Sequence, residues 1–175
     1  VISFNAGQCV MNFETGGKEF ISCLKEIGDM PLPPYIIKKR GTKKADFISY
    51  QTPFAEIDGS VAAPTASLHF SNEFLRSLKE KNIPHCFITL HVSGGTFLPI
   101  REKNINKHKM HSEYASVEEN AALQIRKTLK RGGKLIAVGT TVMRVLESSV
   151  FTDNGFQAFD GSVDTFIKPG HNFKV

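Results

Sequence analysis

The chain is 175 residues long, 41% of them hydrophobic and 22% charged, which is ordinary for a globular protein and excludes a largely disordered one. Its longest apolar stretches, such as residues 135–139, are far shorter than the roughly 20 residues that a bilayer-spanning helix needs, and its first residues show no signal-peptide pattern. We therefore expect a soluble, cytoplasmic protein with no membrane partner.

Lysine and arginine together number 22 against 17 acidic residues, which gives a formal net charge of +5. Such an excess favours an anionic partner such as nucleic acid, although many basic proteins have none. The three cysteines, Cys9, Cys23 and Cys86, are odd in number and widely spaced, which fits neither a disulfide framework nor a Cys-x-x-Cys zinc site. We expect them to be reduced, buried and without a chemical role.

The N-terminal part is predicted to be strand, helix and linker. Residues 1–4 and 8–13 have the character of strands. Residues 18–27 place apolar side chains on one helical face, and Gly28 follows where a C-terminal cap belongs. The three prolines of residues 31–36, PLPPYI, predict a non-helical linker between substructures.

Further along, helical and strand patterns alternate. Ser71 can cap a helix that extends to about Lys81, and residues 86–92 follow as a strand. Ser116 and Glu119 form a capping-box signature for the next helix. The buried stripe of that helix is expected to be Val117, Ala121, Ile125 and Leu129.

Residues 134–138, KLIAV, are predicted to be the next strand. Their nearly continuous apolar character is typical of a parallel strand that is covered on both faces. Gly139 then leads into a helix predicted over residues 141–150. The alternation of helices and strands indicates an α/β domain.

Two glycine-bearing turns follow predicted strands. Residues 93–96, SGGT, follow the strand at 86–92, and residues 139–141, GTT, follow the strand at 134–138. In open α/β sheets, ligands bind at the carboxyl ends of strands, often against helix N-termini whose free amides attract anions. Neither turn is a Walker sequence or a GxGxxG fingerprint. A tight turn is the alternative explanation of residues 93–96, and helix capping alone would explain residues 139–141.

His108, His111 and Glu113 lie within six residues of one another. Two imidazoles and a carboxylate can ligate zinc or iron, so a metal hydrolase is one alternative. The HExxH spacing is absent. The same side chains also suit proton transfer, because imidazole titrates near neutrality.

Residues 59–70, GSVAAPTASLHF, are rich in small side chains. They predict either a segment that borders a pocket or a tightly packed turn with a buried, hydrogen-bonded His69. The sequence leaves both interpretations open.

Five segments together carry a more specific signal: PLPPYI, YQTPFAEIDGSVAAPTASLHF, TLHVSGGTFLPIR, HKMHSEY and IAVGTTVMRVLES. Their order and spacing resemble the S-adenosylmethionine:tRNA ribosyltransferase-isomerase family of queuosine biosynthesis, over essentially the whole chain. The resemblance implies that the ribosyl portion of S-adenosylmethionine is transferred and isomerised onto 7-aminomethyl-7-deazaguanine at the tRNA wobble position. Adenine and methionine would leave, and epoxyqueuosine-tRNA would be the product.

The resemblance also implies a fold: an α/β domain with a mixed sheet and flanking helices, into which a small β-barrel domain is inserted. Residues 1–30 would be the tail of the insert, and residues 31–175 an incomplete α/β catalytic domain. No cofactor or metal is implied, because S-adenosylmethionine is the ribosyl-donor substrate and its sulfonium is already a good leaving group. The implied partner is tRNA, bound around the anticodon by a monomer. An inactive RNA-binding fragment is the alternative.

Candidate site residues follow from their positions in these motifs and from their chemistry. Proton transfer is assigned to His69, His91, His111 and Glu113, with Glu147 a lesser candidate. The bare backbone of residues 94–96 would admit the nucleoside, and the two threonines that begin the last helix suit the methionine carboxylate. Substrate binding is therefore assigned to Gly94, Gly95, Thr96, Gly139, Thr140, Thr141 and Arg144. Both turns are expected to meet at one cleft.

Overall fold

The computed structural model describes residues 2–5, 8–99, 104–108, 110–148, 151–152 and 154–174. They form two compact units, Val1–Pro31 and Leu32–Val175. Within these described stretches, no helix has both the length and the apolar character that crossing a bilayer requires.

The first unit contains one hairpin and one helix. Strands β1 (Ser3–Asn5) and β2 (Gln8–Val10) pair antiparallel. Helix α1 (Gly17–Ile27) ends at Gly28, whose N–H donates to the Leu24 carbonyl at 2.9 Å. The helix predicted over residues 18–27 is therefore confirmed. That this unit is the tail of an inserted barrel stays a prediction.

The cysteines differ from expectation in their burial. All three thiols are free, but Cys9 and Cys23 are exposed and only Cys86 is partly buried. The prediction of buried cysteines is wrong for the first two because they belong to the small unit, whose helix α1 buries no residue. Burial raises the pKa of the Cys86 thiol.

The second unit begins with two short helices, α2 (Pro34–Arg40) and α3 (Asp46–Ser49). The prediction that PLPPYI is non-helical is wrong for its second half. Pro34 occupies the first turn of α2, where the missing N–H of proline would have had no helical partner. Both guanidinium Nη atoms of Arg40 donate to Asp46, at 2.7 and 3.0 Å. This pairing joins α2 to α3 and holds the pKa of Asp46 below its ordinary value.

The predicted cap at Ser71 is confirmed. Helix α4 (Asn72–Glu80) begins after it, and the Ser71 hydroxyl accepts a hydrogen bond from the Phe74 N–H at 3.1 Å. The preceding small-residue run contains a short 3₁₀ helix, η1 (Thr65–His69). Ser67 is buried there, whereas His69 is exposed, so the packed turn does not bury its histidine.

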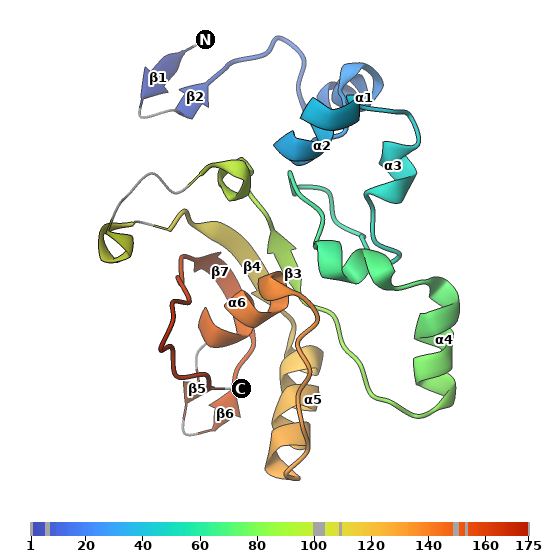
Figure 1. The fold of residues 1–175 in the computed structure, drawn as a ribbon, viewed down its shortest axis with the longest axis vertical. Coiled ribbons are helices and arrows are strands. Elements are labelled where there is room, and N and C mark those ends of the chain that lie inside the picture. The colour runs from blue at the N-terminus through green and yellow to red at the C-terminus, as the bar shows by residue number, and fades with distance from the viewer. Residues whose placement is uncertain are drawn as a thin grey trace. The chain divides into compact units, whose positions relative to one another are not determined.

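A three-stranded antiparallel sheet lies at the centre of the second unit. Its strands are β3 (Thr89–His91), β4 (Glu113–Val117) and β7 (Phe159–Val163), in the order β3-β4-β7. The side chains of β4 alternate between buried and more exposed positions, as expected for a strand whose one face is covered. Figure 1 shows the three strands side by side, with helix α6 crossing one face.

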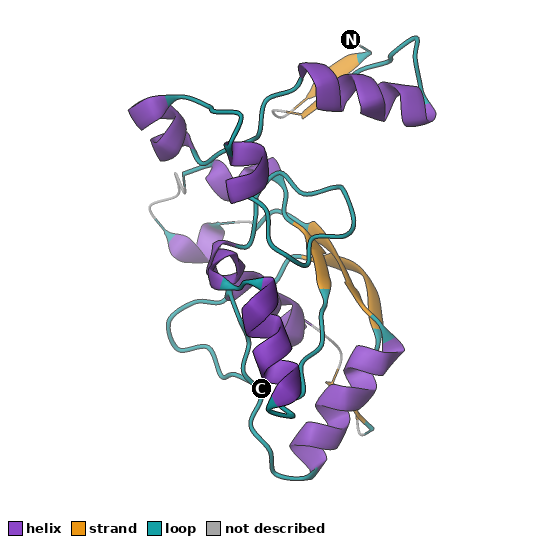
Figure 2. Ribbon diagram, turned by 90° about the vertical axis from the view of Figure 1, so that its right-hand side faces the viewer, coloured by secondary structure: helices purple, strands orange, loops and turns teal. Residues whose placement is uncertain are grey.

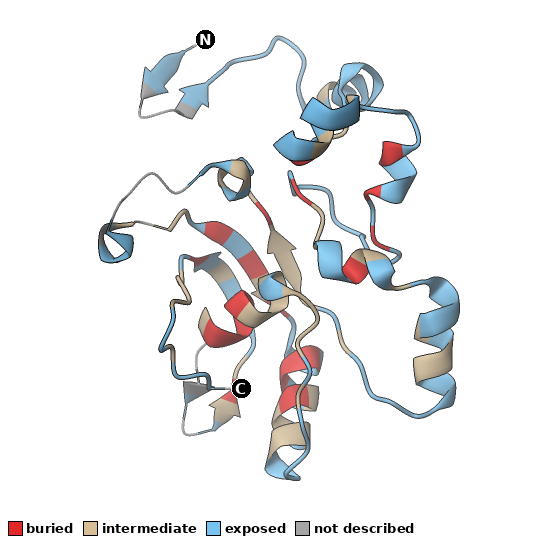
Figure 3. Cartoon of the chain, in the orientation of Figure 1, coloured by how far each residue is buried: buried red, intermediate tan, exposed pale blue. Residues whose placement is uncertain are grey.

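Two helices and a hairpin complete the core. Helix α5 (Glu119–Lys130) follows β4, and helix α6 (Thr140–Ser148) contacts both β3 and β7. The hairpin of β5 (Phe151–Thr152) and β6 (Gly155–Phe156) packs on α5. Figure 2 shows the long loops that join these elements, and Figure 3 shows buried residues concentrated on β4, α5 and α6. The core comprises Ala115, Val117, Ala121, Ala122, Ile125, Val145, Leu146, Phe156 and Val163. The α/β class is confirmed.

The capping box at Ser116 is wrong, because Ser116 lies within β4 and pairs with Thr89 and Asp160. Sheet pairing, which depends on distant segments, outweighs the local cap signal here. Helix α5 begins three residues later. Ala121 and Ile125 are buried, Leu129 packs partly against the core, and Val117 belongs to the strand.

The parallel strand predicted at residues 134–138 is also wrong. These residues form a loop, and every strand pair in the described part of the chain is antiparallel. A strand needs a hydrogen-bonded neighbour, and none is present for them there. The strand predicted at 86–92 is likewise limited to β3. Helix α6 is confirmed, although the predicted residues Ser149 and Val150 lie outside the described residues.

Candidate functional site

The site is built around a buried carboxylate, Glu113, at the start of β4. Its relative exposure is 4%. Glu113 lies on the same face of the strand as Ala115 and Val117, which are core residues. A charge placed this deep is costly unless other groups pair with it.

Three groups from separate segments surround this carboxylate. Arg144 Nη1 donates to Oε2 at 2.5 Å, and the Ser93 N–H donates to Oε1 at 3.0 Å. His111 Nε2 lies 3.4 Å from Oε1, which suits an ion pair when the imidazole is protonated. No hydrogen-bond partner satisfies His111 Nε2 among the described residues. Glu113 therefore joins the end of β3, the segment before β4 and helix α6.

Arg144 extends this junction to the far edge of the sheet. Its Nη2 donates to the carbonyl oxygens of His111 at 2.6 Å and Val163 at 3.1 Å. Its side chain is only 10% exposed. Both Nη atoms are therefore engaged inside the protein, where they hold α6 against β4 and β7.

The two predicted turns are both tied to Glu113. Ser93, which donates to Glu113, directly precedes the short 3₁₀ helix η2 (Gly94–Phe97). Arg144 lies one helical turn after Thr140, the first residue of α6. The turns at 94–96 and 139–141 are thus anchored to the same side chain.

Position 95 requires glycine because the His111 ring lies very close to its backbone. A Cβ atom built there would lie 2.8 Å from Cγ and Nδ1 of His111. The bare backbone at this point therefore accommodates the His111 ring. Because Nε2 faces Glu113, the Nδ1 side of the ring faces the turn.

Gly139 adopts a backbone conformation that favours glycine, with φ at +94°. A Cβ atom there would come within 3.6 Å of Ala66 Cβ in η1. The start of α6 therefore lies against the small-residue segment 59–70.

His91 lies apart from this cluster. It is opposite Tyr114 in the pairing of β3 with β4, and their rings stack with centroids 5.7 Å apart. Tyr114 follows Glu113 directly, so it points to the other face of the sheet. The Tyr114 hydroxyl donates to Asp160 at 2.5 Å, which raises the pKa of the phenol. His91 Nδ1 is buried without a partner in the described part of the chain, against the backbone of Gly59.

The other two histidines singled out in the sequence have no described contact with Glu113 either. His69 is exposed at the end of η1, and none of the described contacts joins it to Glu113. The His108 ring packs edge-on against Phe166, with centroids 5.2 Å apart. In the ranges that the structure describes, no three His, Cys, Asp or Glu side chains are placed to hold a metal ion.

Three further features differ in how far the sequence revealed them. Glu147, the lesser candidate, is 3% exposed, hydrogen-bonds to His171 Nε2 at 2.9 Å and accepts from the Lys174 N–H at 3.0 Å. The Ser93 N–H is a backbone group, which no side-chain pattern reveals. The cluster of basic side chains at residues 38–44 was also missed, although the sequence shows it: five of these seven residues are lysine or arginine.

Comparison with known proteins supports one family. The family model described as "Queuosine biosynthesis protein" matches residues 1–175. A relative from Halothermothrix orenii is 47% identical over 97% of this chain and 48% of its own length. A Zymomonas mobilis relative is 46% identical over 93% of this chain and 48% of its own. Both are named S-adenosylmethionine:tRNA ribosyltransferase-isomerase. The chain spans about half the length of the curated relatives that it matches, and it belongs to the queuosine biosynthesis protein family.

Proposed function

We propose that this chain supplies part of the active site of an S-adenosylmethionine:tRNA ribosyltransferase-isomerase. The relatives' shared name supports the activity. The observation that carries the assignment to this site is the Glu113 carboxylate, which anchors both glycine-bearing turns through Ser93 and Arg144. Residues on two separate motifs of the family are thereby joined in one place.

In the finer proposal, S-adenosylmethionine donates its ribosyl portion to 7-aminomethyl-7-deazaguanine at the wobble position of tRNA, and adenine and methionine leave. The turn of Gly94, Gly95 and Thr96 receives the adenosine portion of S-adenosylmethionine on its open side at Gly94, where an added Cβ atom would meet nothing within 4 Å, while the His111 ring fills the space at Gly95. Gly139, Thr140 and Thr141 receive the methionine carboxylate, because a helix N-terminus offers unpaired amides to an anion. S-adenosylmethionine is a substrate here, and no resident cofactor is invoked.

The reaction needs a base that removes a proton from the activated sugar. We assign this role to His111, whose side chain is 30% exposed and whose Nδ1 side faces the turn at Gly95. Glu113, 3.4 Å from Nε2, is a positioning residue that stabilises the imidazolium formed when Nδ1 accepts the proton. His69 and His91 are less suitable because they lie away from this carboxylate.

The test uses a chimaera: the Halothermothrix orenii relative in which the matched stretch is replaced by the part of the present chain that aligns with it, over 169 residues. It is incubated with S-adenosylmethionine and tRNA bearing 7-aminomethyl-7-deazaguanine, and released adenine is measured. Adenine is expected only with the modified tRNA, and His111→Ala should lower its rate by about 10²–10⁴-fold. A folded chimaera that binds both substrates but releases no adenine would reject the activity.

Contact with tRNA has its own prediction. Lys38, Lys39 and Lys43 are exposed around the end of α2, and phosphate contacts make binding salt-dependent. Replacing all three with alanine should weaken tRNA binding and reduce the slope of log K against log salt by about 2–3. The matched control replaces Lys79, Lys81 and Lys134, which are also exposed. Equal losses in both variants would mean that only net charge matters, and that residues 38–44 are not the contact.

A further inference from the structure

The side chains of residues 134–138 alternate as they do in a β-strand, but the backbone of these residues is not paired with another strand in the described structure. Leu135 and Ala137 pack against the core, while Ile136 between them is 83% exposed. Alternation with period two is typical of a strand lying on a core. Nevertheless, none of the described hydrogen bonds involves the backbone of these five residues.

The segment that leads into β3 repeats this pattern. Cys86 and Ile88 pack against the core, and Phe87 is 51% exposed. At the other end of β3, the edge not facing β4 is covered, because the Ser60 hydroxyl donates to the Leu90 carbonyl and the Val61 N–H donates to the Val92 carbonyl. No described hydrogen bond covers the backbone of residues 86–88 in this way.

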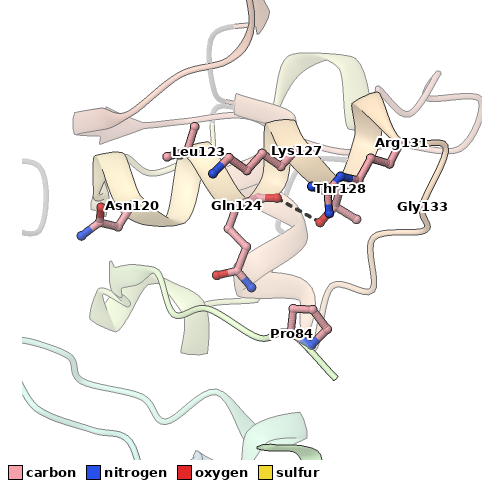
Figure 4. Close-up of a pocket in the computed structure, with 8 residues that line it drawn as sticks. All are labelled: Pro84, Asn120, Leu123, Gln124, Lys127, Thr128, Arg131 and Gly133. Atoms are coloured by element: carbon pink, nitrogen blue, oxygen red, sulfur yellow. Dashed lines mark hydrogen bonds between the residues drawn. The ribbon is translucent and has the colours of Figure 1, made fainter. Parts of the chain in front are cut away.

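The two segments are close at both ends. Pro84 and Gly133, where they begin, line one pocket of about 430 Å³ together with Gln124 and Thr128 of α5. Figure 4 shows Pro84 on the opposite side of this pocket from α5, and Gly133 in the loop that follows α5. At their other ends, α6 follows residues 134–138 and contacts β3. The segments therefore run in the same direction over one core without pairing with each other.

We propose that residues 134–138 become a β-strand when a further extended, apolar segment pairs with them, and that this segment comes from the half of the family's length that the present chain does not span. The Halothermothrix orenii relative extends over about twice the matched stretch, since the chain covers 48% of it. An added strand would satisfy the open backbone groups and cover Ile136. An exposed isoleucine beside unpaired backbone has no other cover in the described unit.

Amide hydrogen exchange tests this independently of enzymatic activity. In the 175-residue chain, the amides of residues 135–138 should exchange nearly as fast as in an unfolded peptide. In the chimaera they should exchange at least about 100-fold more slowly. Equal rates in the two proteins would overturn the proposal. Protection that appears in the chain alone and grows with its concentration would also overturn it, because the partner would be a second copy.

A variant pair identifies the covered side chain. Ile136→Lys should leave the melting temperature of the 175-residue chain unchanged and lower that of the chimaera by several degrees. Ile48→Lys is the matched control, since Ile48 is 82% exposed on α3, and it should change neither protein. An Ile136→Lys chimaera as stable as its parent would contradict the proposed strand.

Discussion

Replacing Arg144 with alanine is expected to lower the free energy of unfolding by about 3–5 kcal/mol. The substitution leaves the Glu113 carboxylate, 4% exposed, without the guanidinium that donates to it at 2.5 Å. It also removes the donor to the His111 and Val163 carbonyl oxygens. Urea denaturation of the purified chain measures the change.

Two further variants separate the ion pair from general effects of losing an arginine. Arg76→Ala removes an exposed guanidinium that pairs with Glu73 at 3.3 Å, and it should cause no measurable loss because exposed pairs contribute little. The double variant Glu113→Gln, Arg144→Met should recover part of the stability, because it removes both charges together. A loss below about 1 kcal/mol for Arg144→Ala would mean that Glu113 does not depend on this pairing.

Replacing Phe156 with alanine is expected to cost about 3–5 kcal/mol in the free energy of unfolding. Phe156 is 0% exposed and is the largest fully buried side chain among the described residues. It joins the β5–β6 hairpin to α5, where Arg126 Nη1 also donates to its carbonyl oxygen at 2.9 Å. Truncating the ring leaves a cavity between hairpin and helix.

Phe47→Ala is the control for this second prediction. Phe47 is 45% exposed on α3, so its truncation leaves no closed cavity and should change stability by roughly 0.5 kcal/mol or less. Similar losses for the two variants in urea denaturation would show that Phe156 is not central to the core.

Local signals in the sequence predicted the four longer helices, α1, α4, α5 and α6, because amphipathic faces depend on neighbouring residues, but the short helices α2 and α3 were missed. Ser71 caps α4 and Gly28 ends α1, as expected. The strands were predicted less well, because pairing depends on distant segments. Strand β4 was missed because Ser116 was interpreted as a helix cap. Residues 134–138 were predicted to be a strand, although no hydrogen-bonded partner strand is described for them.

The candidate site was predicted as a set of residues but not as an arrangement. His111, Glu113 and Arg144 meet, although 31 positions separate Glu113 from Arg144. No local pattern reveals that contact, or the backbone donor at Ser93. His91 was grouped with them, but its position opposite Tyr114 places it on the other face of the sheet. The face on which His91 lies depends on the register of β3 against β4, which is determined by the whole fold and not by the local sequence.

The two glycine-bearing turns are expected to bind a single ligand, and this is best measured by NMR on the chimaera with ¹⁵N-labelled glycine and threonine, titrated with S-adenosylmethionine. The amides of Gly94 and Gly95 should shift together with those of Gly139 and Thr140, with one shared dissociation constant. If the ligand binds and only one turn responds, or neither does, Glu113 does not organise a common site for S-adenosylmethionine.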